Sequence, residues 1–289
     1  MNPISFLTQM IRIAAPYLFA ASGGVIAERS GIISLGLEGY MLSGAFAATL
    51  GAHYTGSAWI GVLCGMFGGL VFGLIHGIAS IRYKADQVVT GIAINLLAIG
   101  VTRFFLKLAF ASSSNSPRIP GFGGNQAMHG FDNPLLWLAI ITAPVLAFVI
   151  YRMPYGLRVR AVGEHPAAAA SLGVNPKRIQ YIAVAISGIL AALGGVFLAL
   201  DQHQFTDQMT AGRGFIAVAA VIFGRWDPVR SALACLFFAF AETLQIQLQG
   251  NEIIPSQFIE MIPYALTIIA LAGVVGRAVP PAALGKATE

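Results

Sequence analysis

The chain has 289 residues, of which 57% are hydrophobic and only 10% are charged, and its mean hydropathy is +0.76. This small number of charged side chains cannot solvate the whole surface of a water-soluble protein. The composition therefore excludes a soluble protein and indicates a polytopic membrane protein. A net charge of +5 would suggest a nucleic-acid partner for a soluble chain. In a membrane protein the same residues first serve as topology signals, and no nucleic-acid partner is expected.

Nine apolar segments are each long enough, at roughly 17 to 25 residues, to cross the hydrocarbon core of a bilayer as a helix. Backbone groups in lipid must be hydrogen-bonded internally, and the segments are too long for barrel strands, which predicts an all-α fold with eight to ten spans. Residues 1–289 are expected to form a single transmembrane domain. The nine segments are 10–27, 32–52, 58–80, 86–107, 134–151, 180–200, 205–224, 230–249 and 257–276.

Two of these segments are candidates for broken or re-entrant helices. The first is short and contains Pro16, and the seventh is introduced by the polar string DQHQFTDQMTAGRG. Polar side chains and glycines of this kind disfavour a continuous helix in lipid.

The Lys and Arg residues concentrate on one side of the membrane. If the nine segments alternate in direction, 12 of the 17 basic residues share the side of the 152–179 loop. The positive-inside rule makes that side cytoplasmic, with the N-terminus outside and the C-terminus inside. The twelve are Arg29, Arg82, Lys84, Arg152, Arg158, Arg160, Lys177, Arg178, Arg225, Arg230, Arg277 and Lys286.

The sequence lacks the motifs of the common enzyme classes. The one Gly-Lys pair, Gly285-Lys286, is followed by Ala and is not a P-loop, and there is no G-x-S-x-G nucleophile elbow. The histidines do not occur at metal-ligand spacing from one another or from a cysteine, so no metal site is expected. We therefore predict a transport protein that is not an enzyme and holds no cofactor of its own. The histidines are His53, His76, His129, His165 and His203.

Polar side chains at membrane depth are costly and mark functional or packing sites. Several recur on one face of an expected helix, such as Gln87, Gly91 and Asn95 in the fourth segment. These faces either line a translocation path or form hydrogen bonds between helices. The residues predicted for the path are Glu38, Asn95, Arg213, Glu242 and Gln245.

Arg213 and Glu242 are expected at similar depth. On the boundaries given above, both lie roughly 11 to 12 Å from the outer ends of their segments, at ~1.5 Å per residue. An ion pair between them, or a shared contact with a solute, would avoid an unpaired charge in lipid.

Glycine recurs every four residues in the third segment, in GVLCGMFGGLVFGLIHG. A helix grooved in this way allows another backbone to approach closely, either within the chain or at a subunit interface. The series comprises Gly61, Gly65, Gly69, Gly73 and Gly77.

The cytoplasmic loop 152–179 contains VGEHPAAAASLGVNP, which predicts a helix of about two turns. Pro166 suits the first helical position, Ala167 to Ala170 have high helix propensity, and Gly173 suits the position after the helix. Because so short a helix is marginal in water, it should be held by docking on its own protein or on a partner.

Four stretches, in order, resemble the permease subunits of ABC importers of the ribose and branched-chain amino acid transport superfamily. The resemblance covers nearly the whole chain and is greatest to the nucleoside or simple-sugar branch, which is served by basic-membrane-protein-type binding lipoproteins. The stretches are ERSGIISLGLEGYMLSGAFAA, DQVVTGIAINLLAIGVT, YGLRVRAVGEHPAAAASLGV and TAGRGFIAVAAVIFGRWDPV.

The resemblance implies a pair of permease subunits, often two different chains, with two cytoplasmic ATPases that bind ATP-Mg and an external substrate-binding lipoprotein. Residues 163–173 match the coupling segment of the family, although His165-Pro166 replaces the more usual Asn-Pro or Asn-Ala and leaves the N-cap bond open. The ATPase contact is accordingly expected at Gly163, Glu164, His165, Pro166, Ala167, Ala170 and Gly173.

The solute implied by the resemblance is a nucleoside, with ribose, another simple sugar, a branched-chain amino acid or a flavin-like molecule as alternatives. Two other classes stay open on the sequence alone. An ion-coupled secondary transporter could use Glu38, Glu242 and His76 as titrating groups, and a passive channel would depend on no partner.

Overall fold

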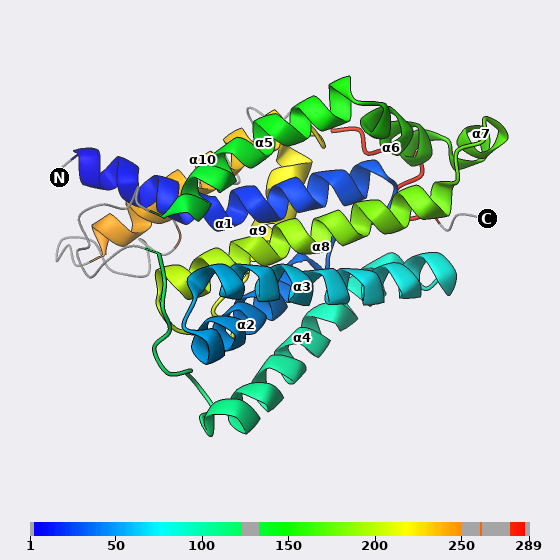
Figure 1. The fold of residues 1–289 in the computed structure, drawn as a ribbon. Coiled ribbons are helices and arrows are strands. Elements are labelled where there is room, and N and C mark those ends of the chain that lie inside the picture. The colour runs from blue at the N-terminus through cyan, green and yellow to red at the C-terminus, as the bar shows by residue number, and fades with distance from the viewer. Residues whose placement is uncertain (1–2, 123–132, 250–260, 262–277, 287–289) are drawn as a thin grey trace.

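The computed structural model describes residues 3–122, 133–249, 261 and 278–286 (Figure 1). In these ranges the secondary structure is helical, apart from one isolated β-bridge between Asn115 and Thr206. The helices are α1 Pro3–Arg29, α2 Leu37–Thr55, α3 Ala58–Gly77, the π-helical turn η1 Ile78–Arg82, α4 Gln87–Phe110, α5 Pro134–Arg152, α6 Pro154–Glu164, α7 Pro166–Ser171, α8 Pro176–Asp201, α9 Arg213–Phe223 and α10 Pro228–Leu248.

Six of these helices are long and apolar enough to cross a membrane, counting only the part of the chain that the structure describes. They are α1, α3 with η1, α4, α5, α8 and α10, and they correspond to six of the nine expected segments. The segment 32–52 corresponds to α2, which is 19 residues long but more polar. The segment 257–276 lies outside the described residues apart from Met261, so the expected number of about nine spans is not confirmed.

The expected segment 205–224 is not one continuous helix, and the alternative of a broken helix is confirmed, because α9 has only 11 residues. At ~1.5 Å per residue it is roughly 16 Å long, about half the thickness of the hydrocarbon core. After α8 the chain makes turns through 202–212, where His203, Gln208 and Ala211 have positive φ, before Gly212 precedes the helix with φ +82°. The polar residues of this stretch favour turns over a helix.

The first segment, in contrast, is not broken. The helix α1 runs through Pro16 from Pro3 to Arg29, well beyond the expected range of 10–27. Neighbouring helices shield a proline-containing turn of this kind, and α1 is 78% buried over its apolar window.

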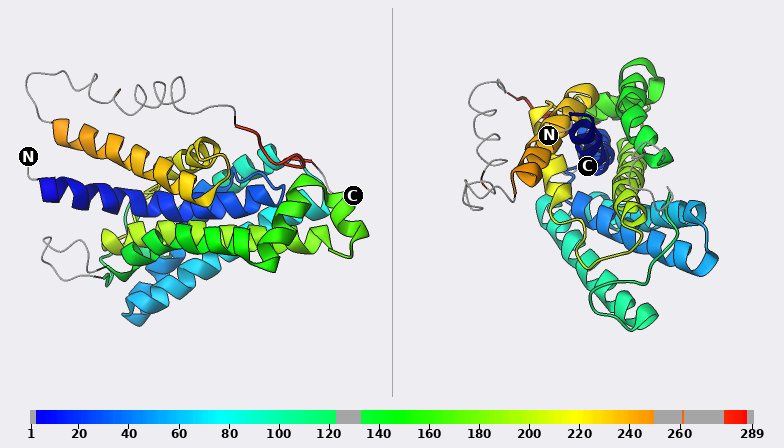
Figure 2. Two further views of the ribbon diagram at one scale, coloured as in Figure 1. Left: turned by 90° about the horizontal axis from the view of Figure 1, so that it is seen from above. Right: turned by 90° about the vertical axis from the view of Figure 1, so that its left-hand side faces the viewer.

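The helices α1 and α8 form the centre of the bundle (Figures 1 and 2). Helix α8 packs against α1, α2 and α3, and α1 packs also against α5, α9 and α10. The N-terminus lies at one end of the bundle, and α6, α7 and residues 278–286 lie at the other. Segments far apart in sequence therefore meet at the end that carries the 152–179 loop.

The glycines of α3 allow it to pack closely within the chain. A Cβ atom at Gly69 would lie 2.3 Å from the carbonyl oxygen of Gly188, and one at Gly65 would lie 2.2 Å from the Val196 side chain. Both partners belong to α8. The glycine repeat is thus explained by packing inside the subunit, the first of the two alternatives that the sequence left open.

Candidate functional site

The carboxylate of Glu38 binds the N-terminus of the half-length helix α9. Glu38 is the second residue of α2, and its two oxygens accept hydrogen bonds from the backbone N–H groups of Gly212 (2.8 Å) and Gly214 (2.6 Å). The approach requires glycine, because a Cβ atom at Gly214 would lie 2.4 Å from the backbone nitrogen of Glu38. A negative charge at this position satisfies free N–H groups and complements the helix dipole.

A cavity of about 350 Å³ lies beside this contact, between α2, α4 and the start of α9. Its volume is in the range of small-molecule binding sites in proteins. Most of the lining is apolar, and Glu38 is the one ionisable side chain among the described residues that form it. The cavity is lined by Glu38, Leu42, Ile92, Asn95, Leu96, Ile99, Gln208, Thr210, Ala211, Gly212 and Phe215.

Asn95 lines the cavity, but its side chain forms hydrogen bonds with the backbone of the same subunit. Its side-chain oxygen accepts a hydrogen bond from Gly39 N–H, and its NH₂ group donates to the carbonyl of Leu35, both at 2.8 Å. About two turns earlier on the same face of α4, the Gln87 side-chain oxygen accepts from Ile33 N–H at 2.8 Å. The polar face of α4 therefore holds the segment that leads into Glu38.

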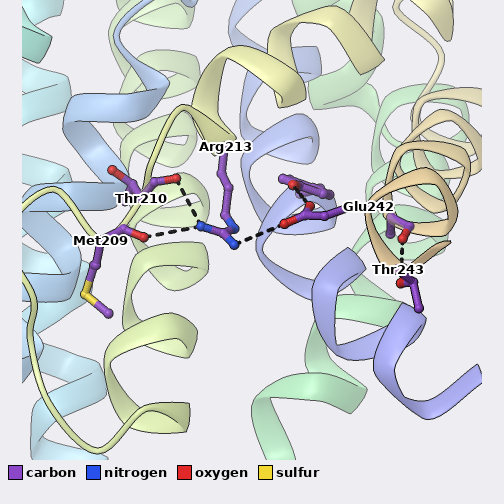
Figure 3. A network of polar contacts seen from close by, with 7 residues as sticks. Met209, Thr210, Arg213, Glu242 and Thr243 are labelled. Carbon is purple, nitrogen blue, oxygen red and sulfur yellow. Dashed lines mark hydrogen bonds and ion pairs between the residues drawn. The ribbon is translucent and has the colours of Figure 1, made fainter. Parts of the chain in front are cut away.

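The expected ion pair between Arg213 and Glu242 is present (Figure 3). The guanidinium lies 3.3 Å from the carboxylate and also donates to the carbonyl oxygens of Met209 (3.3 Å) and Thr210 (3.5 Å). The other carboxylate oxygen of Glu242 accepts a hydrogen bond from the hydroxyl of Tyr17. This cluster ties α10 and α1 to the start of α9.

The five path candidates thus fall into two groups. Glu38 and Asn95 line the cavity, whereas Arg213, Glu242 and Gln245 are not among its lining residues. Arg213 and Glu242 brace α9 from the side of α10. Gln245 lies three residues beyond Glu242 on α10 and is partly buried. A role in the path stays a prediction for all five.

Two ion pairs and a short backbone pairing hold the turns between α8 and α9. Arg12 of α1 lies 2.8 Å from Asp201, and Arg103 of α4 lies 2.7 Å from Asp207. Residues 114–119 pair with 203–207 through the backbone, for example from Ser116 N–H to the Phe205 carbonyl. These contacts were not foreseen, because the residues that form them lie far apart in the chain.

The loop 152–179, which includes the coupling segment 163–173, contains two helices, α6 and α7, where the sequence predicted one. Helix α7 begins at Pro166 and has six residues, fewer than the two turns expected. It ends as predicted, with Gly173 at φ +82° donating to the Ala170 carbonyl. The question of the N-cap is answered in part, because His165 makes no side-chain capping bond.

Helix α7 is held on its own chain by one alanine. Ala169 is buried in a small cluster with Val159, Val162 and Ile179. Burial raises the pKa of Tyr155, which packs against this cluster, to about 12, so the phenol stays neutral at physiological pH. Five of the predicted contact residues remain exposed, together with Leu172, which is 84% exposed. The five are Glu164, His165, Ala167, Ala170 and Gly173.

Gly163 is buried by other parts of the same chain. A Cβ atom there would lie 2.0 Å from the carbonyl oxygen of Arg29, and the Gly163 carbonyl accepts from Ala283 N–H at 2.9 Å. Glu164 accepts from Ala282 N–H at 3.2 Å, and Gly285 N–H donates to the Gly31 carbonyl at 3.1 Å. Residues 282–285 thus bridge the coupling segment and the turn after α1.

A second contact with this turn was not foreseen from the sequence. The buried carboxylate of Glu28 accepts hydrogen bonds from the Trp226 indole at 2.5 Å and from Ser34 N–H at 3.2 Å. Arg29 donates to the Trp226 carbonyl at 2.8 Å. Because Arg225 and Trp226 both have positive φ, these bonds hold an unfavourable turn between α9 and α10. An acidic residue directly after an apolar segment was the available signal.

No three His, Cys, Asp or Glu side chains gather as metal ligands within the described residues. Cys64 and Cys235 are free thiols.

Comparison with known proteins matches residues 6–271 to the family described as the permease component of branched-chain amino acid transport systems. The chain is 40% identical to the guanosine ABC transporter permease protein NupQ of Bacillus subtilis, over 94% of this chain and 92% of that protein. It is 34% identical to the nucleoside ABC transporter permease protein NupC of Lactococcus lactis, over 96% and 95%. The fold resembles that of a metal-chelate type ABC transporter in an inward-facing conformation, with a TM-score of 0.55 and 13% identity over 92% of this chain and 85% of that one.

Proposed function

The chain belongs to the family of permease components of branched-chain amino acid transport systems, and from this premise we propose that it carries nucleosides through the membrane as a subunit of an ATP-binding-cassette importer. The names of NupQ and NupC support the solute class. The observation that carries the proposal is the cavity between α2, α4 and α9, at which the half-length helix α9 begins. A nucleoside needs such an apolar site with a few polar groups.

The cavity offers groups suited to a nucleoside. Phe215 is 48% exposed and can stack on a base. Thr210 and Gln208 bring uncharged polar side chains to the same wall. The protein chain performs no covalent chemistry in this scheme, since the solute only changes sides.

The work is supplied by partners. Separate cytoplasmic ATPases bind ATP-Mg and contact the exposed face of α7, a homologous second permease completes the path, and an external lipoprotein delivers the solute. Two contacts, one at each end of the turn between α1 and α2, support a route for motion from α6 to the cavity. Gly163 packs on Arg29 at one end of this turn, and Glu38 holds α9 just beyond the other.

The proposed orientation places α6, α7 and the described C-terminal residues in the cytoplasm of a bacterium and the N-terminus outside. The distribution of Lys and Arg supports it. So does the contact of residues 282–285 with the coupling segment, which requires one common side.

Uptake by the reconstituted complex tests the function. The chain is purified with the products of neighbouring ATPase and permease genes, placed in proteoliposomes and supplied with binding lipoprotein and labelled uridine or guanosine. We expect accumulation that requires ATP, is lost with a hydrolysis-deficient ATPase, and is competed by nucleosides but not by ribose or leucine. Counterflow without ATP or ATPase would instead establish a secondary transporter.

A further inference from the structure

The N-terminus of α9 already holds a negative charge from the chain itself. The Glu38 side chain is buried, with Glu38 only 9% exposed, and each of its oxygens takes one N–H group of this helix end. A helix N-terminus that opens on a cavity otherwise attracts anions such as phosphate. Here that position is filled.

Among the residues that the structure describes, none supplies a free cation to the cavity. Its other polar side chains, Asn95, Gln208 and Thr210, are uncharged. The nearby Arg213 is already paired with Glu242 and bonded to two carbonyl oxygens. A solute anion in the cavity would therefore lie near the Glu38 carboxylate in an environment of low dielectric constant, where like charges repel strongly.

We propose that Glu38 determines specificity by charge: by filling the N-terminus of α9, it admits neutral solutes and rejects their anionic forms, such as a nucleoside 5′-monophosphate. Glu38 also positions Ala211, Gly212 and Phe215 of the cavity wall through the same two hydrogen bonds. This inference rests on the proposed function, since it concerns the solute that the cavity takes.

Direct binding measures the discrimination without selection by the lipoprotein. Labelled uridine and labelled uridine 5′-monophosphate are titrated onto the detergent-purified complex, with the ATPase sites filled by excess ADP. Glu38→Gln removes the charge at nearly constant size, and Glu38→Asp keeps the charge. Asp86→Asn is the matched control, because Asp86 caps α4 through Val88 and Val89 N–H groups, both at 2.9 Å, and does not line the cavity.

We expect the natural protein, Glu38→Asp and Asp86→Asn to prefer uridine by at least about tenfold, and Glu38→Gln to lower this preference to about threefold or less. Loss of a helix cap alone would leave the ratio of the two affinities unchanged, as in Asp86→Asn. An unchanged ratio in Glu38→Gln, loss of the preference in Glu38→Asp, or failure of both variants to assemble would overturn the role in specificity. Absence of uridine binding by the natural protein would contradict the proposed function instead.

Discussion

At the scale of single residues, the charged side chains of Arg213 and Glu242 near the start of α9 are paired with each other. Arg213 and Glu242 satisfy each other, and Tyr17 and the Met209 carbonyl take up remaining hydrogen-bonding capacity. The side chains of the pair are 22% and 25% exposed, so neither charge is well solvated. Removing one partner leaves the other uncompensated, which costs more than removing both.

Glu242→Gln should therefore destabilise the subunit more than the double change Arg213→Gln with Glu242→Gln. We expect the single change to cost about 1–3 kcal/mol, in the range for leaving one polar partner buried and unsatisfied. Thermal unfolding of the purified variants in detergent measures the order. If the double variant is less stable than either single one, the two residues do not act mainly as a pair.

The sequence predicts some contacts of the site and not others. Helical periodicity predicted the polar face of α4, because helix geometry fixes the spacing. The ion pair of Arg213 with Glu242 was also predicted, although the depth of Arg213 was counted along a helix from residue 205 and α9 begins only at Arg213. It could not show that Asn95 is bonded to Gly39 and Leu35. Nor could it pair Glu28 with Trp226, which lies 198 residues away.

At the scale of elements, the contact between α6 and α1 depends on a missing side chain. Gly163→Ala would place a methyl group 2.0 Å from the Arg29 carbonyl oxygen and force α6 away from α1. We expect ATP-driven uptake to fall by about an order of magnitude while the variant still reaches the membrane. Gly100→Ala is the control, since nothing lies within 4 Å of a Cβ there. Equal uptake by the two variants would show that the contact carries no motion.

The exposed face of α7 predicts a different loss. Ala170→Asp adds a charge to this face without touching the buried Ala169. We expect at least about a tenfold weaker association with the ATPase, measured by co-purification, because an unpaired charge in an interface is costly. Ala161→Asp, at an exposed alanine of α6, is the comparison. Equal association of both variants with the ATPase would exclude a specific role of α7.

The elements themselves were largely predictable where the apolar pattern is long. Helix α8 was expected over 180–200 and runs from Pro176 to Asp201. The segment 205–224 does not form one continuous helix for a local reason, since turns with positive φ at Gln208, Ala211 and Gly212 occupy its first half. Helix α6 was missed because it is polar, with Arg158, Arg160 and Glu164, and its stability comes from packing on neighbours.

At the scale of the molecule, the orientation predicts opposite chemical accessibility of two loops. In a chain with Cys64 and Cys235 replaced by Ala, Leu172→Cys should react with an impermeant maleimide only after permeabilisation. Ser113→Cys, in the 112–122 segment at the opposite end of the bundle, should react in intact cells. Both positions are exposed. The reverse pattern would place α7 outside and contradict the proposed ATPase contact.

The bridge formed by residues 282–285 also sets an order of events during synthesis. These residues leave the ribosome after every helix that the structure describes, since chains emerge from the N-terminus. Until then, the carbonyls of Gly31 and Gly163 and the carboxylate of Glu164 lack their partners. A nascent subunit therefore holds α6 loosely against α1, and the proposed ATPase-binding surface is completed only after residues 282–285 have been synthesised.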